Sequence, residues 1–200
     1  MTTVDYFMSH GSPWSFLGHN RLIEIAKKYN ANVNMYPVNY GEIFPISGGL
    51  PVSKRPPQRQ NIRLQELQRW SKFLKINLHA EPTFFPSKSM LPSLIIIASQ
   101  LKKTNKDFDI ANNVMNALWN LDLDIDDEYV LKSILEKMGL DAEDILLCAK
   151  GEKCLNIIQE YTKLAIKKGV FGAPTYIIDD QIYWGQDRLD FVERHLSSLI

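Results

Sequence analysis

The chain has 200 residues, a length that suits one compact domain or one domain interrupted by an insertion. Hydrophobic residues make up 45% and charged residues 23%, and this near-average composition excludes a disordered chain, a fibrous repeat and a disulfide scaffold. Because 23 Lys and Arg balance 23 Asp and Glu, there is no excess positive charge to favour a nucleic acid or an anionic membrane as partner.

The apolar runs of the sequence are too short for a membrane span. The longest covers residues 94–98, whereas a transmembrane helix needs roughly 20 apolar residues. Only two cysteines occur, Cys148 and Cys154, and their spacing fits neither a disulfide framework nor a metal site. These features predict a cytoplasmic protein that holds no metal.

The first 38 residues predict a strand, a helix and a second strand. Residues 4–8 are apolar and rich in side chains that favour strands. Pro13 suits the first position of a helix that extends to about residue 29, which places Ser12 at its N-cap. Residues 33–38 alternate as a second strand does.

Residues 40–60 interrupt this pattern. Glycines and prolines punctuate the segment, and Lys54, Arg55 and Arg59 make it basic, so we predict a loop or a domain boundary. Helical periodicity then dominates for about a hundred residues. The helices expected from it cover residues 62–74, 91–101, 110–121, 128–138, 141–149 and 155–168. The aromatic residues expected in the core of this helical part are Trp70, Phe84, Phe85 and Trp119.

Strand character returns after Gly169. Residues 175–178 and 182–184 predict a hairpin, and the apolar positions of residues 189–199 predict a final amphipathic helix. The two ends of the chain must pair, because neither can bury its hydrophobic face alone. The predicted fold is therefore α/β, a thioredoxin-like fold with a large all-helical insertion. Its thioredoxin-like domain comprises residues 1–40 and 169–200, and the inserted helical domain comprises residues 41–168.

Three loops of such a fold can contribute to one site, and the first is Ser12-Pro13-Trp14-Ser15. The N-terminus of a helix favours an anion, typically by about 0.3–1 kcal/mol. Hydroxyls at Ser12 and Ser15 cannot form a disulfide, which excludes dithiol exchange in this loop. The hydroxyl of Ser12 can still donate a hydrogen bond to an anionic sulfur of a ligand, and it equally suits a simple helix cap.

The second and third loops lie near the C-terminus. Pro174 in the second loop follows Ala173, and the alternatives there are a cis-proline that exposes its preceding backbone to a thiol ligand and a plain turn. The third loop contains Gln186 and Asp187. Asp187 can pair with an α-ammonium group while the helix start binds a carboxylate, or both residues can simply cap the last helix.

These segments together resemble the 2-hydroxychromene-2-carboxylate isomerase family, which is related to kappa-class glutathione transferases and to DsbA-like proteins. The resemblance extends nearly from end to end and is more specific than any single motif. The segments that carry it, in the order and spacing of the family, are residues 4–7 (VDYF), 12–18 (SPWSFLG), 169–175 (GVFGAPT) and 184–189 (WGQDRL).

The resemblance implies a glutathione-dependent enzyme. It implies that Ser12 is the catalytic residue and hydrogen-bonds the sulfur of glutathione. It further implies that the backbone of Ala173, before a cis Pro174, pairs with the cysteinyl part of the cofactor, and that Gln186 and Asp187 hold its γ-glutamyl end.

The resemblance also implies a basic ligand contact ahead of the first inserted helix. Arg59 occupies that place, where relatives have lysine, and a planar guanidinium binds differently from an ammonium group. The implied reaction is attack of the glutathione thiolate on a small conjugated carbonyl or aromatic compound, leading to isomerisation or to a stable conjugate. Homodimers are common among relatives, so a homodimer is implied as well.

His10 departs from the family pattern. We expect it to be an exposed and inert loop residue, with substrate contact as the alternative. A competing function is a redox-inactive thioredoxin-fold module that binds thiol peptides or a protein partner. A disulfide oxidoreductase is opposed by Ser12 and Ser15, and by the helical setting of the two cysteines.

Overall fold

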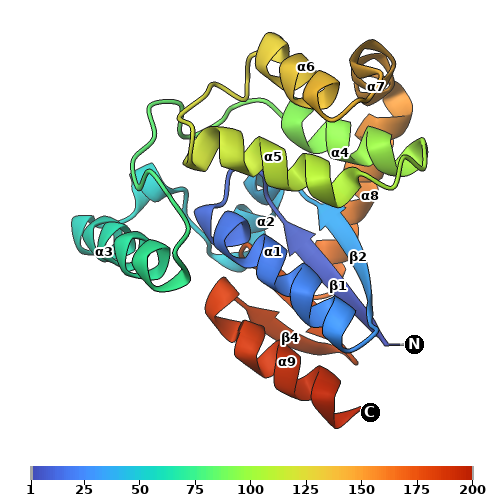
Figure 1. The fold of residues 1–200 in the computed structure, drawn as a ribbon. Helices are drawn as coiled ribbons and strands as arrows, with labels where there is room; N and C mark the ends of the chain where they lie inside the picture. Colours follow the sequence, from blue (N-terminus) through green and yellow to red (C-terminus); the bar gives the residue numbers. More distant parts are fainter. Residues whose placement is uncertain (1, 200) are drawn as a thin grey trace.

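The computed structural model describes residues 2–199. A four-stranded sheet with the strand order β2-β1-β3-β4 lies at its centre, and helices cover both faces (Figure 1). Strands β1 and β2 are parallel, whereas β3 is antiparallel to both β1 and β4. This mixed sheet confirms the predicted thioredoxin-like fold with inserted helices.

The N-terminal half of the sheet has the predicted strand, helix and strand. These are β1 (Thr3–Met8), α1 (Pro13–Lys28) and β2 (Asn32–Pro37). Ser12 is the N-cap of α1, and its hydroxyl oxygen accepts a hydrogen bond from the backbone N–H of Ser15 at 3.2 Å. The capping side chain and Pro13 at the first helical position fix where the helix begins.

The C-terminal half is also as predicted. It consists of β3 (Thr175–Ile178), β4 (Gln181–Trp184), the short 3-10 helix η2 (Gln186–Arg188) and α9 (Leu189–Ser198). The two residues between the strands, 179 and 180, both have positive φ angles of 47° and 61°. Aspartate tolerates this left-handed conformation, which suits a two-residue hairpin turn.

Residues 40–60, expected to form a loop or a domain boundary, are mostly helical. The segment contains α2 (Tyr40–Ser47) and the 3-10 helix η1 (Val52–Lys54), and α3 (Pro57–Leu74) begins within it. Asn39 caps α2 by accepting a hydrogen bond from a backbone N–H at 3.0 Å, and Gly48 ends that helix in the left-handed conformation at φ 76°. The glycines and prolines therefore mark helix boundaries as well as turns.

The remaining helices lie close to their expected positions. Their bounds are α4 (Leu91–Leu101), α5 (Asp107–Trp119), α6 (Glu128–Lys137), α7 (Ala142–Ala149) and α8 (Glu152–Lys167). Of the aromatic residues expected in the helical core, Trp119 is fully buried, but Phe84 is 40% exposed. Within residues 2–199, no helix has both the length and the apolar character needed to cross a bilayer.

The two faces of the sheet have separate hydrophobic cores. One core joins Tyr6 and Met8 of β1 to the buried side chains of α1, α4, α5 and α9. The other joins Phe7 of β1 and Ile177 of β3 to side chains of α2 and α8. Successive residues of β1 therefore point to opposite faces, as the pleat of a strand requires.

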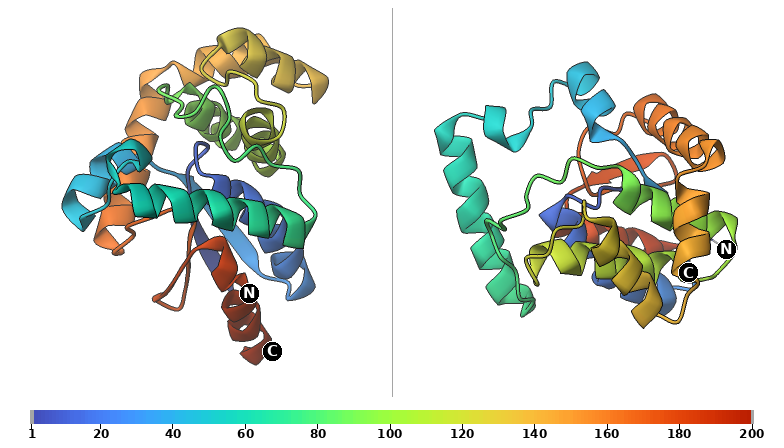
Figure 2. Two further views of the ribbon diagram at one scale, coloured as in Figure 1. Left: turned by 90° about the vertical axis from the view of Figure 1, so that its left-hand side faces the viewer. Right: turned by 90° about the horizontal axis from the view of Figure 1, so that it is seen from above.

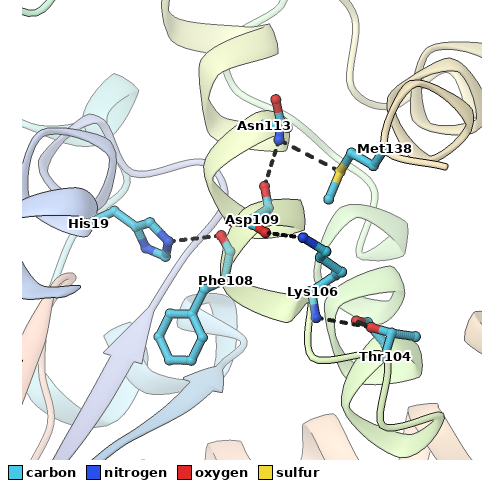
Figure 3. A network of polar contacts seen from close by, with 8 residues as sticks. His19, Thr104, Lys106, Phe108, Asp109, Asn113 and Met138 are labelled. Carbon is cyan, nitrogen blue, oxygen red and sulfur yellow. Dashed lines mark hydrogen bonds and ion pairs between the residues drawn. The ribbon is translucent and has the colours of Figure 1, made fainter. Parts of the chain in front are cut away.

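His19 ties α1 to the inserted helices. Its Nε2 lies 3.0 Å from the carbonyl oxygen of Phe108 at the start of α5 (Figure 3). Its Nδ1 lies 3.3 Å from the hydroxyl of Tyr6. Because the carbonyl can only accept, Nε2 carries the proton and Nδ1 accepts from the tyrosine. Burial lowers the pKa of His19 to about 4, which is consistent with a neutral ring.

The long helix α3 lies along one side of the molecule (Figure 2). It packs against α1, yet only Arg63 and Leu67 of its residues are buried. Little apolar surface therefore attaches this helix to the rest of the chain.

Candidate functional site

The first and second predicted loops meet at Ser12 and Ala173. The hydroxyl of Ser12 donates a hydrogen bond to the carbonyl oxygen of Ala173 at 3.3 Å. The peptide bond between Ala173 and Pro174 is cis. The structure therefore brings together two segments that are far apart in the sequence, at the N-terminal end of α1.

The surroundings of Ser12 suit an anionic ligand. The residue is partly exposed, and the first turn of α1 contains no acidic side chain to offset the positive end of the helix dipole. Ser12 accepts the N–H of Ser15 and donates to Ala173, so its hydroxyl uses both of its hydrogen-bonding roles.

Hydrogen bonds fix the backbone of the cis-proline loop. The carbonyl oxygen of Gly172 accepts from the hydroxyl of Tyr40 at 3.0 Å and from that of Thr175 at 2.6 Å. The carbonyl oxygen of Pro174 accepts from the N–H of Gly185 at 2.9 Å. Burial raises the pKa of Tyr40 well above 10, so this phenol stays protonated and keeps donating.

The third loop is supported by a residue that the sequence analysis missed. Nη1 of Arg21 donates to Oε1 of Gln186 at 2.7 Å and to its backbone oxygen at 3.2 Å. Gln186 is 1% exposed, and its Nε2 has no hydrogen-bond partner among residues 2–199. An unpaired buried donor is costly, so the amide of Gln186 is a polar group whose setting needs an explanation.

Asp187 is the outward-facing residue of this loop. Its carboxylate lies 3.3 Å from Arg188, and the side chain is 40% exposed. Within the part of the chain that the structure describes, neither Gln186 nor Asp187 makes a side-chain capping bond to η2 or α9. The bond from Gly185 to Pro174 places the loop directly beside the cis-proline.

Arg59 lies apart from the contacts that join the three loops. It is exposed in the first turn of α3, and its positive charge contributes to the lowered pKa of Arg55. The structure therefore places a basic cluster on α3 and the preceding segment, and it does not bring Arg59 into contact with Ser12 or Ala173.

The expectation that His10 is an exposed loop residue is wrong. It is 6% exposed, with Nδ1 2.7 Å from the hydroxyl of Ser93 and Nε2 3.2 Å from that of Ser87. Ser87 in turn donates to the carboxylate of Asp126 at 2.5 Å. Burial lowers the pKa of His10 to about 4, although Asp126 acts in the opposite direction. The neutral ring therefore ties the loop before Ser12 to the inserted helices.

An aromatic pair flanks the cis-proline loop. The rings of Phe171 and Trp184 lie 4.7 Å apart, and the residues are 40% and 49% exposed. A Cβ atom on Gly172 would overlap the indole of Trp184, so the tryptophan lies this close only because residue 172 is glycine. The pair offers apolar surface beside the site. Both residues lie in the segments 169–175 and 184–189 that the sequence analysis singled out, but neither was assigned a role there.

The two cysteines belong to α7 and α8, away from the three loops. Both are free thiols, and burial raises the pKa of Cys154 to about 12, which keeps it protonated. Among residues 2–199, no group of three or more His, Cys, Asp or Glu is arranged to hold a metal ion.

Comparison with known proteins matches this arrangement to a group of thioredoxin-fold proteins. The family described as DSBA-like thioredoxin domain matches residues 3–197. A 2-hydroxychromene-2-carboxylate isomerase of Sphingobium xenophagum is 25% identical over 195 residues, which cover 97% of each chain. The human glutathione S-transferase kappa 1 is 25% identical over 207 residues, covering 98% of this chain and 91% of the relative.

A solved structure supports the same relationship. The structure of a 2-hydroxychromene-2-carboxylate isomerase has a TM-score of 0.86 and 26% identity, covering 98% of this chain and 95% of the other. These comparisons confirm the resemblance that the sequence motifs indicated.

Proposed function

The chain belongs to the DSBA-like thioredoxin domain family, and from this we propose that it is a glutathione-dependent enzyme, either an isomerase of the 2-hydroxychromene-2-carboxylate isomerase type or a glutathione transferase. Near full-length relatives with these two names support both activities. The substrate would be a small conjugated carbonyl or aromatic compound. Serine in place of both active-loop cysteines opposes disulfide exchange.

The residues of the site fit glutathione. Ser12 offers a hydroxyl donor at an unneutralised helix N-terminus, Ala173 offers backbone before a cis-proline, and Gln186 has an unpaired buried amide. Asp187 would pair with the α-ammonium of the γ-glutamyl end, and Arg59 would contact a carboxylate. When bound, glutathione supplies a thiolate for addition to the conjugated substrate.

Ser12 would act by favouring the ionised sulfur. A free thiol has a pKa of about 8.5, so only a few per cent is thiolate at neutral pH. A hydrogen bond from the Ser12 hydroxyl together with the helix dipole would lower that pKa by about one to two units, each worth about 1.4 kcal/mol. The single observation that carries the proposal is the hydrogen bond between Ser12 and Ala173, because it places the hydroxyl against the cis-proline loop.

Calorimetric titration with glutathione tests the proposal. The wild-type protein, Ser12→Ala and the control Ser197→Ala, an exposed serine of α9, would be titrated at about pH 7 and pH 8. The ultraviolet absorbance of the bound thiolate would give the thiol pKa. We expect a lowered thiol pKa in the wild type and the control, and a return towards the free value in Ser12→Ala. No binding of glutathione to the wild type would overturn the proposal.

A redox-inactive module that binds thiol peptides or a protein partner is the second candidate. The exposed pair of Phe171 and Trp184 beside the cis-proline loop favours it, because such apolar surface suits a peptide side chain. The two candidates differ in turnover. An enzyme consumes an α,β-unsaturated ketone in a glutathione-dependent way, whereas a binding module leaves it unchanged.

We also propose a cytoplasmic location and a homodimer. Two free thiols suit a reducing compartment, and the homodimer is carried over from the resemblance to the isomerase family. Sedimentation of the purified protein tests the second proposal, since a mass of 23.0 kDa in solution would contradict it.

A further inference from the structure

Arg63 of α3 is a buried cation between aromatic rings. The residue is 8% exposed, and its guanidinium carbon lies 5.2 Å from the ring centre of Phe85 and 5.8 Å from that of Trp119. The ring faces attract the cation. Arginine is almost never this buried unless it is paired with an anion, so the setting of Arg63 requires an explanation.

The missing partner is a hydrogen-bond acceptor. Nη2 of Arg63 and Nε1 of Trp119 are both buried, and neither has a hydrogen-bond partner among residues 2–199. Both atoms are donors only. An unpaired donor on a buried cation calls for an anionic acceptor, and a carboxylate, which can accept several hydrogen bonds, meets this requirement.

The positive charge extends beyond Arg63. Burial and then the charge of Arg55 lower the pKa of Arg63 to about 10, against a smaller opposing effect of Glu81. Burial and then the charge of Arg59 lower the pKa of Arg55. Arg55 therefore repels both Arg63 and Arg59, although the whole chain has no net charge. A bound anion would relieve this repulsion.

Arg63 is connected to the loop before Ser12 through the segment between α3 and α4. Phe85, which contacts Arg63, is two residues from Ser87, and Ser87 lies 3.2 Å from His10 in the loop before Ser12. Helix α3 packs against α1 and lies along one side of the molecule (Figure 2). Because α3 has only two buried side chains, a small displacement of the helix would cost little apolar burial.

We propose that Arg63 binds the carboxylate of a small molecule held at the Ser12 site, with the indole N–H of Trp119 as a second donor and Arg55 as a supporting charge. This assignment rests on the proposed function, because it gives that site its ligand. The flat rings of Phe85 and Trp119 suit a planar, conjugated acid. The carboxylate can come from the substrate or from the glycyl end of glutathione, and both have the same chemistry.

Binding of unreactive probes tests the proposal without turnover. In the first arm, calorimetry would compare the affinities of trans-cinnamate and the uncharged cinnamamide for the protein saturated with S-methylglutathione. In the second arm, without S-methylglutathione, it would compare the affinities of glutathione and its glycyl monoethyl ester. We expect the wild type to prefer the free acid about tenfold or more in one of the arms, which identifies the source of the carboxylate.

Variants at position 63 then assign the preference to the guanidinium. Arg63→Met keeps the length of the side chain and should abolish the preference, whereas Arg63→Lys keeps the charge and should retain part of it. The control Arg69→Met changes an exposed arginine of the same helix and should retain all of it. Thermal melts of every variant would report whether it folds.

Each outcome decides the question. A preference for the acid that disappears in Arg63→Met supports the proposal. Equal affinities of the wild type for acid and uncharged probe in both arms would overturn it, even if Arg63→Met failed to fold, and would leave a buried water as the partner of Arg63. A preference that survives in Arg63→Met would overturn it too. None of these results depends on a lowered thiol pKa. A negative result for Arg63 is therefore distinct from a negative result for the proposal that Ser12 favours the thiolate of glutathione.

Discussion

The hydroxyl of Ser12 donates to the carbonyl oxygen of Ala173 at 3.3 Å, across 161 positions of the sequence. A hydroxyl has only one proton, so Ser12 cannot donate to this oxygen and to a ligand sulfur at the same time. The loop therefore keeps the donor occupied while holding it beside the cis-proline. An exchange of one acceptor for another would limit the net gain from ligand binding.

Substitutions of Ser12 should separate its capping role from its role towards the ligand. Ser12→Ala loses the N-cap bond and should lower the free energy of unfolding by about 1–2 kcal/mol. Ser12→Gly should cost less, because glycine is itself an acceptable N-cap. Urea denaturation would measure the free energy of unfolding of both variants. If the two variants are equally unstable, the cap bond to Ser15 does not stabilise α1 as we infer.

Acidification should destabilise the protein through His10 and His19. Burial lowers the pKa of both to about 4, whereas the unfolded chain has a histidine pKa of about 6.5. The unfolded state therefore binds more protons between these values, and stability is lost as the pH falls through this window. At pH 5 the loss should be about 2 kcal/mol for each histidine relative to neutral pH.

Variants identify which histidine is responsible. Urea denaturation from about pH 7 to pH 5 should show a smaller loss for His10→Asn and for His19→Gln than for the wild type. The control is His79→Gln, which changes an exposed histidine. A wild-type slope that persists in both buried-site variants would mean that other groups govern the acid sensitivity.

Gly18 should be intolerant of alanine. A Cβ atom there would lie 2.6 Å from the hydroxyl of Tyr176 and 3.0 Å from Cβ of Gln186, and both residues are buried. We expect Gly18→Ala to lower the unfolding free energy by about 1–3 kcal/mol, despite the higher helix propensity of alanine. The displacement of Gln186 should also weaken glutathione binding.

Gly172→Ala is the matched comparison. Its Cβ would meet only the indole of Trp184, a half-exposed side chain that can swing outward. We therefore expect Gly172→Ala to lose less stability than Gly18→Ala. Thermal and urea denaturation of both variants and the wild type would measure the two losses. Equal costs at the two glycines would show that the buried tyrosine adapts as easily as the exposed tryptophan.

Arg21 should matter for glutathione binding although it is a positioning residue. Arg21→Met removes both donors to Gln186 and leaves its amide free to turn. We expect the dissociation constant for glutathione to rise about three- to tenfold. Arg194→Met, which changes an exposed arginine of α9, is the control. Unchanged affinity in Arg21→Met would argue against Gln186 as a ligand contact.

Local signals predicted most of the fold. The cap at Ser12, the alternation of residues 33–38 and the helical periodicities are set by neighbouring residues, and the structure confirms them. Helix α2 was missed within residues 40–60, which were expected to form a loop or a domain boundary, because the glycines and prolines were given more weight than two signals for a helix. Asn39 was an available cap, and the apolar side chains of Tyr40 and Ile43 lie one helical turn apart.

Residues buried by distant segments were harder to identify. His10 is covered by residues 87 and 93, whose approach depends on the folding of the insertion. The pairing of Arg21 with Gln186 joins positions 165 residues apart. Arg63 did leave a local signal, because it lies four residues before the core residue Leu67 and therefore on the same face of α3.

The core that joins β1 to α4 and α5 constrains how this protein can diverge. The inserted helices cannot be exchanged as a free module, since their apolar side chains complete the packing of the sheet that holds Ser12. A substitution made in the insertion to admit a new substrate must also preserve that packing. We therefore expect substitutions in the buried part of the insertion to lower stability, and new specificities to arise first at exposed positions of the lightly attached α3.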